Sequence, residues 1–228
     1  MRTIKTPFEI SIMKEAGQIA GAMMAAAHDS LREGAQEYES ALAVIEAGSR
    51  KAATFLTDKG WDRFVSPMIH NLQILQSGTD ASMVHRRASV KAYQKFDPVY
   101  FCFCNMAQFK QYKLGFDRMF HIGDVTDPAR DVQEAAIEAQ QAAIEVYRAR
   151  GYETGYRTGR SIGVAYLEAP ELKEGDKTVL QPGMTFAVDG GISVDGVTAG
   201  RIGDSVVVTE SGTDYITSYP REILLSKG

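Results

Sequence analysis

The period of the hydrophobic pattern changes along the chain, and this change constrains the fold more than any other feature. Apolar residues recur at helical spacing from Ile12 to Leu31 and again from about Gln36 to Leu56. Later, glycine-rich turns divide the chain into short apolar runs. Helices that precede strands, instead of alternating with them, are typical of α+β proteins. We expect an α+β fold in a single domain over residues 1–228, because no linker interrupts the pattern.

The expected elements have recognisable ends. Thr6, Pro7 and Glu9 have the types and spacing of an N-cap, a first-turn proline and a capping-box partner, and Gly34 is expected to close this first helix. A third helix is expected to start at Asp127. The expected strands are 99–104, 116–122, 161–167, 184–189 and 204–209.

Charge and hydropathy exclude several classes of protein. Lys and Arg total 25 against 29 Asp and Glu, a net charge of −4, and no basic block is present. Nucleic-acid binding is therefore not expected, because phosphate neutralisation needs clustered cations. No apolar run approaches the ~20 residues of a membrane span, and the first residues lack the apolar core of a secretory signal. We expect a cytoplasmic protein with no membrane partner.

The two cysteines, Cys102 and Cys104, lie in an apolar run. On a strand they would share a face, and a disulfide between them would be strained, so we expect reduced, buried thiols. A zinc site with His85 and His121 is an alternative, but the cysteine spacing is not that of the usual zinc knuckle. A nucleophilic Cys102 is another, and it would need a nearby cation such as Arg160.

Four stretches, in this order, carry a resemblance to a known family. They are 5–10 (KTPFEI), 34–42 (GAQEYESAL), 75–82 (LQSGTDAS) with His85, and 181–186 (QPGMTF) followed by 201–205 (RIGDS). Together they resemble the pita-bread family of methionine aminopeptidase, Xaa-Pro peptidase and creatinase. The resemblance implies a curved antiparallel sheet covered by helices.

Within that family the chain is most similar to the creatinase and ectoine-hydrolase branch, through residues 79–85 (TDASMVH) and 157–163 (RTGRSIG). Members of this branch open a C–N bond in a small nitrogen-rich molecule. They usually carry an additional N-terminal domain. Because the resemblance starts at residue 1, we expect the catalytic domain without it.

The metal site implied by the peptidases of this family is not kept. They hold two metal ions with two Asp, one His and two Glu. The resemblance places these ligands at Cys102, Gly115, Arg160, Asp189 and Gly203. Only Asp189 keeps an oxygen ligand, and an arginine in place of the histidine repels a cation. No metal and no other cofactor is expected.

The remaining polar residues near these positions form the expected site. The candidate catalytic residues are His85, Asp189 and Asp204. The candidate substrate-binding residues are Arg118, Arg160, Arg201, Asp117, Cys102 and His70. Creatinase-like enzymes likewise work without metal, using histidine and carboxylates to hold a guanidinium-like group and to move protons. The chemistry permits this, because a protonated amidine carbon is already electrophilic. Some candidates have structural alternatives: Arg118 can pair with Asp117 or Asp204, and His85 can be a core or orienting residue.

The function expected from the sequence is a metal-independent hydrolase acting on a C–N bond of a small nitrogen-rich compound. Two alternatives stay open: a degenerate family member that binds a ligand or partner without catalysis, and a non-hydrolytic lyase. The family usually has a helix between the one ending near Arg150 and the strand after Gly159, and here the connection is short. Its loss would expose apolar surface, so we expect a homodimer.

Overall fold

The computed structural model describes residues 3–60, 63–69, 74–83, 85–104, 108–142 and 158–227. In these ranges the helices are α1 (Pro7–Ser30), α2 (Glu37–Asp58) and α3 (Asp127–Ala142), with a short 3-10 helix η1 (Gly78–Ser82). The strands are β1 (Ile74–Ser77), β2 (Pro98–Cys102), β3 (Gln108–Phe109), β4 (Tyr112–Lys113), β5 (Asp117–His121), β6 (Gly159–Ser161), β7 (Glu168–Leu172), β8 (Thr185–Val194), β9 (Thr198–Thr209), β10 (Gly212–Tyr215) and β11 (Leu224–Leu225).

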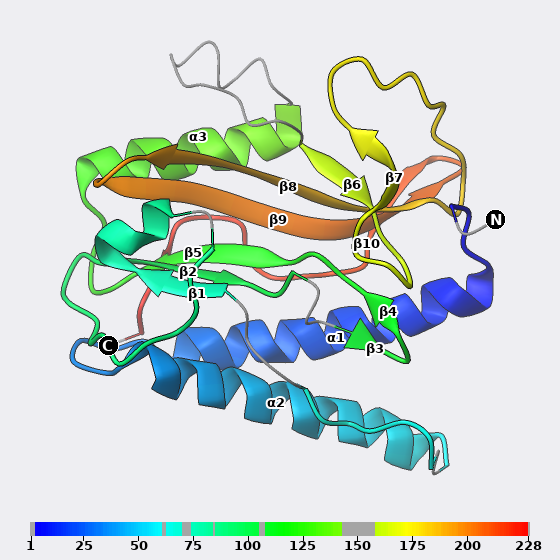
Figure 1. The fold of residues 1–228 in the computed structure, drawn as a ribbon, viewed down its shortest axis with the longest axis horizontal. Coiled ribbons are helices and arrows are strands. Elements are labelled where there is room, and N and C mark those ends of the chain that lie inside the picture. Colours follow the sequence, from blue (N-terminus) through cyan, green and yellow to red (C-terminus); the bar gives the residue numbers. More distant parts are fainter. Residues whose placement is uncertain are drawn as a thin grey trace.

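One large sheet organises the described residues. Its strand order is β1-β2-β5-β9-β8-β6-β7, and all neighbours in this path are antiparallel. Strand β10 extends β9, and β11 adds to β5 in parallel. Figure 1 shows the curved sheet with α3 on one face and the α1–α2 pair on the other. The expected α+β fold, a curved antiparallel sheet covered by helices, is confirmed.

Different apolar groups hold the two layers together. Helix α3 packs on β8 and β9 through Val132, Ala135, Ala139 and Ile192. The larger core lies under α1 and includes its methionines and the phenylalanines of β2 and β5. The sheet is therefore covered by apolar side chains on both faces at its centre.

Local sequence signals explain the limits of α1. Thr6 Oγ1 accepts from the Glu9 N–H, and the Glu9 carboxylate accepts from the Thr6 N–H, which is the predicted capping box. The helix ends at Ser30 with Leu31 as C-cap, earlier than predicted. Gly34, with φ of +82°, instead serves the turn into α2, where its backbone conformation favours glycine.

Most predicted strands are present with changed limits. The 99–104 and 116–122 runs are β2 and β5, and those near 184–189 and 204–209 belong to the long β8–β9 hairpin. The 161–167 prediction was wrong in part, because β6 ends at Ser161 and a turn leads to β7 at Glu168. Strand β1 was not predicted.

Two other expectations concern membranes and the connection after α3. None of the described helices combines the length and the hydrophobicity that crossing a bilayer requires. The predicted loss of a covering helix concerns residues 151–157, which lie outside the described residues.

Candidate functional site

The candidate site is a row of residues across neighbouring strands of the large sheet. Cys102 of β2 lies opposite Asp117 of β5, Asp117 lies opposite Gly203 of β9, and Gly203 lies opposite Asp189 of β8. Residues that face each other across strands project to the same side of a sheet. Arg160 of β6 pairs with Ala187, two residues before Asp189. The sheet therefore gathers positions that are far apart in the sequence.

An arginine–carboxylate pair lies in this row. Arg160 Nη1 donates to Asp189 Oδ2 at 2.5 Å, while Arg160 Nη2 lies 3.8 Å from Cys104 Sγ. The guanidinium stacks 4.3 Å from the ring centroid of Tyr166. A Cβ added to Gly115 would lie 3.7 Å from Arg160 Nη2. The guanidinium thus lies among the positions at which the resemblance places metal ligands.

The residues present do not fit a pair of divalent metal ions. Asp189 supplies the one carboxylate among those positions, and its Oδ2 is bound by Arg160. Gly115 and Gly203 offer no side chain, and a Cβ on Gly203 would overlap the carboxylate of Asp117. Divalent ions of the kind bound by oxygen ligands need several such ligands and are repelled by a neighbouring guanidinium.

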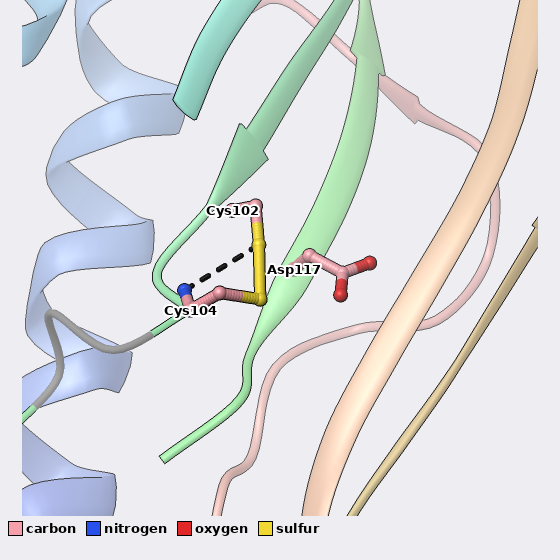
Figure 2. A group of neighbouring side chains, drawn as sticks. All are labelled: Cys102, Cys104 and Asp117. Carbon is pink, nitrogen blue, oxygen red and sulfur yellow. Dashed lines mark hydrogen bonds between the residues drawn. A yellow bond between two sulfur atoms is a disulfide. The ribbon is translucent and has the colours of Figure 1, made fainter. Parts of the chain in front are cut away.

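Cys102 and Cys104 form a disulfide, so the expectation of reduced thiols was wrong (Figure 2). The period-two argument fails because β2 ends at Cys102, and Cys104 lies beyond the regular strand. Their Cα atoms are 5.4 Å apart, within the range of ordinary disulfides. In this state Cys102 is neither a free nucleophile nor a zinc ligand. It also has no thiol group with which to bind substrate, contrary to the prediction from the sequence.

Asp117 is a buried carboxyl group beside this disulfide (Figure 2). It is 2% exposed, and its Oδ1 has no hydrogen-bond partner among the described residues. Burial, followed by repulsion from Asp189, raises the pKa of Asp117 to about 8. Asp117 therefore carries a proton at neutral pH and can act as an acid.

Arg201 and His85 supply the exposed side of the site. The Arg201 guanidinium lies 5.1 Å from the ring centroid of Tyr100, and its Nη2 donates to Ser193 Oγ at 2.8 Å. The pKa of His85 is lowered, first by desolvation and then by the charges of Arg201 and Arg160. The imidazole is therefore neutral at pH 7 and lies within the field of two cations, which favours an anionic ligand.

Arg118 and Asp204 form part of the scaffold, contrary to the prediction that they bind substrate and catalyse. Both side chains are 1% exposed, and Arg118 Nη2 lies 3.0 and 3.3 Å from the two carboxylate oxygens of Asp204. The other guanidinium nitrogens of Arg118 donate to backbone carbonyls, including that of Pro220 at 2.8 Å. Asp204 also accepts from Thr217 and Arg221. Neither side chain has a polar group left over for a ligand.

Two residues near the site, Tyr166 and Glu37, were not predicted from the sequence. Tyr166 stacks on Arg160, and no pattern around it signals this role. Glu37 at the start of α2 is fully buried and accepts from Arg86 at 2.9 Å and from Ser77 Oγ at 2.7 Å. It ties the segment that carries His85 to the helix layer. His70 lies outside the described residues.

The fold and the sequence are both similar to those of known peptidases. The family profile described as "Metallopeptidase family M24" matches residues 11–155 and 145–210, most of the chain. The chain belongs to metallopeptidase family M24. Its fold is the pita-bread fold predicted from the resemblance.

Relatives in family M24 with different names match the chain over most of its length. It is 28% identical to agropine synthesis cyclase of Rhizobium rhizogenes, over 92% of this chain and 58% of that protein. It is 26% identical to the uncharacterized peptidase YqhT of Bacillus subtilis, over 99% of this chain and 65% of YqhT. The chain thus spans about three fifths of the length of these relatives.

Two solved structures share this fold over nearly the whole chain. Prolidase from Pyrococcus furiosus has a TM-score of 0.83 at 26% identity, covering 96% of this chain and 66% of the prolidase. Dipeptidase PepE from Mycobacterium ulcerans has a TM-score of 0.85 at 24% identity, covering 99% of this chain and 62% of PepE. The second likeness concerns the fold alone.

Proposed function

We propose that this M24 protein is a metal-independent hydrolase that opens a C–N bond in a small, nitrogen-rich compound carrying an acidic group. The observation that carries the proposal is the Arg160–Asp189 ion pair, which lies where the resemblance to the family's peptidases implies metal ions. A cation and a carboxylate in that place can bind a zwitterionic substrate. The resemblance to creatinase and ectoine hydrolase implies the same type of substrate.

The neighbouring groups support a proton-transfer mechanism. Neutral His85 can accept a proton from water as its oxygen attacks the amidine or guanidino carbon. The C–N bond then breaks, and the departing nitrogen takes a proton from Asp117, which holds one at neutral pH. The products are a carbonyl compound and an amine, so the atoms of one water are consumed.

The charges of the site support binding of an acidic substrate. Arg201 Nε is buried without a partner among the described residues, and its Nη2 faces the short side chain of Ser193. A carboxylate can accept two hydrogen bonds from one edge of such a guanidinium. Asp189 keeps one oxygen, Oδ1, that can accept from a substrate N–H while Oδ2 holds Arg160.

A relative's name also supports chemistry other than peptide hydrolysis. Agropine synthesis cyclase, which is 28% identical to this chain, is named for a cyclisation. Other relatives are named as dipeptidases, such as the Xaa-Pro dipeptidase of Pyrococcus furiosus, which is 27% identical. Sequences of this similarity therefore carry names from more than one reaction class, and our choice between these classes is argued from the chemistry of the site.

Thermal unfolding with a ligand panel tests the proposal first. The panel contains creatine, ectoine, related cyclic amidines, prolyl dipeptides and manganese. A ligand at 100 times its Kd adds about 2.7 kcal/mol, or roughly 5–10 °C in midpoint for a domain of this size. We expect a shift with an amidine or guanidino acid. A shift with manganese, with turnover of a dipeptide that a chelator abolishes, would contradict the proposal.

Turnover of the selected compound in oxygen-labelled water separates the alternatives. Hydrolysis places the label in the product, whereas a lyase leaves the product unlabelled, and a binding protein yields no product. His85→Gln and Asp117→Asn should each lower kcat by about 100-fold or more, in line with the loss of an acid–base group. Arg50→Gln, on the exposed face of α2, is the control and should not change kcat.

A homodimer is also proposed, on the sequence argument alone. Light scattering of the purified chain during size exclusion tests it. A mass of one chain, 25.0 kDa, at micromolar concentration would contradict the dimer.

A further inference from the structure

The disulfide of this chain is asymmetric in its exposure. Cys102 is 1% exposed, whereas Cys104 is only partly buried. The chain has no other cysteine, so no third thiol can exchange with the pair. Both sulfur atoms are buried, but Cys104 is the residue that reaches the surface, so a thiol entering from solution meets Cys104 Sγ first and Cys102 Sγ is the sulfur that leaves.

The surroundings of the pair stabilise its reduced form. Arg160 Nη2 lies 3.8 Å from Cys104 Sγ, and a neighbouring cation favours a thiolate over a thiol. On the other side, the ligand atoms of Cys102, Cys104 and Asp117 all lie within 4.8 Å of one another. Figure 2 shows the carboxyl group of Asp117 beside the two sulfurs.

We propose that Cys102 and Cys104 form a redox-active pair that exchanges two electrons with small thiols carrying a carboxylate. This activity is independent of the hydrolase proposed above, although both use the same face of the sheet. The preference for a carboxylate follows from Arg160, whose Nη2 lies 3.8 Å from Cys104 Sγ, and from Arg201, which stacks on Tyr100 in the same cluster as the two cysteines.

The exchange proceeds in two balanced steps. A thiolate RS⁻ attacks Cys104 Sγ, the disulfide breaks, and Cys102 leaves as a thiolate that takes a proton from the Asp117 carboxyl group. A second RS⁻ attacks the substrate sulfur of the mixed disulfide and releases RSSR and the Cys104 thiolate, which Arg160 stabilises. Two thiolates have lost two electrons, and the protein disulfide has gained them.

Rates of reduction by matched thiols test the charge preference. The oxidised protein is treated with 3-mercaptopropionate, 2-mercaptoethanol or cysteamine, and free thiols are counted after alkylation by intact-protein mass spectrometry. Each rate constant is divided by the rate constant of the same thiol with a small-molecule disulfide. This ratio corrects for differences in the intrinsic reactivity of the three thiols. We expect at least a tenfold advantage for 3-mercaptopropionate over cysteamine. Arg201→Gln should reduce this advantage, and Arg50→Gln should not.

Two single-cysteine variants test the asymmetry. Cys102→Ser keeps the sulfur of the more exposed residue and should form a mixed disulfide with oxidised 3-mercaptopropionate, seen as a mass increase. Cys104→Ser keeps the buried sulfur and should react at least tenfold more slowly, with circular dichroism confirming that both variants are folded. Equal reaction of the two variants would overturn the proposal. The proposal would also be overturned if the disulfide were reduced only in the presence of denaturant. Failure of oxidised 3-mercaptopropionate to re-form the disulfide from the reduced protein would overturn it as well.

Discussion

Arg160 reaches from β6 to β8 and donates to Asp189 Oδ2 at 2.5 Å, so two strands of the sheet are joined by a charge pair at the centre of the site. Asp189→Leu leaves the 5%-exposed Arg160 without its counterion. We expect a loss of about 1–3 kcal/mol in the free energy of unfolding, below the ~3–5 kcal/mol of a fully buried pair because Asp189 is partly solvated.

The double variant Arg160→Met with Asp189→Leu removes both charges. It should recover most of that loss, because no uncompensated charge is left. Urea unfolding of the two single variants and the double variant gives the coupling energy. Additive losses would show that the pair contributes nothing to stability.

Helix α1 offers a matched pair of glycines one turn apart. A Cβ on Gly17 would overlap the backbone carbonyl oxygen of Ile216, whereas a Cβ on Gly21 would meet Ser218 O at 3.6 Å, an ordinary contact. Gly17→Ala should destabilise the protein by about 2 kcal/mol or more, since the backbone must shift. Gly21→Ala should be neutral or stabilising by up to about 1 kcal/mol, through helix propensity. Thermal unfolding of both variants checks the contrast, and equal midpoints would contradict it.

The buried pair of Arg118 and Asp204 should behave as a structural element. Asp204→Ala leaves a buried guanidinium unpaired, so we expect a loss of about 3–5 kcal/mol in the free energy of unfolding. Arg221→Gln removes a more exposed partner of the same carboxylate and should cost less than about 1 kcal/mol. Denaturant titration distinguishes these losses. A stable Asp204→Ala protein with only its turnover lost would return Asp204 to the catalytic group.

Asp117 makes stability fall as pH rises. Its pKa is about 8 in the folded protein against an ordinary 3.8, so between these values the folded state holds a proton that the unfolded state has lost. The stabilisation by the neutral acid is complete below pH 4 and disappears towards pH 8, with a slope of at most about 1.4 kcal/mol per pH unit. Asp117→Asn imitates the neutral acid and should flatten this slope. Urea unfolding at pH 5, 6, 7 and 8 measures it, and an unchanged slope would contradict the assignment.

His121 has the opposite effect at lower pH. Burial, with the charge of Arg130, lowers its pKa from 6.5 to about 4, and neither ring nitrogen has a hydrogen-bond partner among the described residues. Between pH 4 and 6.5 the unfolded state binds the extra proton, so stability falls on acidification through this window. His121→Leu should remove that part of the acid sensitivity. Comparing thermal midpoints at pH 5 and pH 7 tests it, and an equal difference in wild type and variant would contradict it.

The helices and the fold class could be predicted because their signals are local or repeated. The capping box of Thr6 and Glu9 and the apolar spacing of α1 need no tertiary information. The β6–β7 break could not be predicted, because the apolar run after Ser161 has the composition of a strand. The structure turns there, and the Gly163 carbonyl accepts from the Lys113 N–H instead of from a neighbouring strand of the large sheet.

The sequence predicted several residues that the sheet brings close together, such as Asp117, Arg160 and Asp189, but not the contacts that their charged groups make. Arg118 and Arg160 are both arginines beside carboxylates, and only the structure shows that Arg118 also donates to backbone carbonyls whereas Arg160 donates to Asp189. The disulfide was missed because the alternation of side chains holds only as far as β2 extends. Glu37 was missed because its partners lie 40 to 52 residues further along the chain.

The segment after β9 fixes the order in which a newly made chain can complete its site. Arg118 receives its acceptors from Asp204 and from the carbonyls of Tyr219 and Pro220, and β11 pairs with β5 through Leu224. During synthesis on the ribosome, every candidate site residue therefore emerges before the segment that holds the centre of the sheet in place. Until residues 217–225 arrive, Phe120 and His121 of β5 lack their parallel partner strand, and Arg118 lacks the carbonyl acceptors of Tyr219 and Pro220, which is the state most exposed to aggregation.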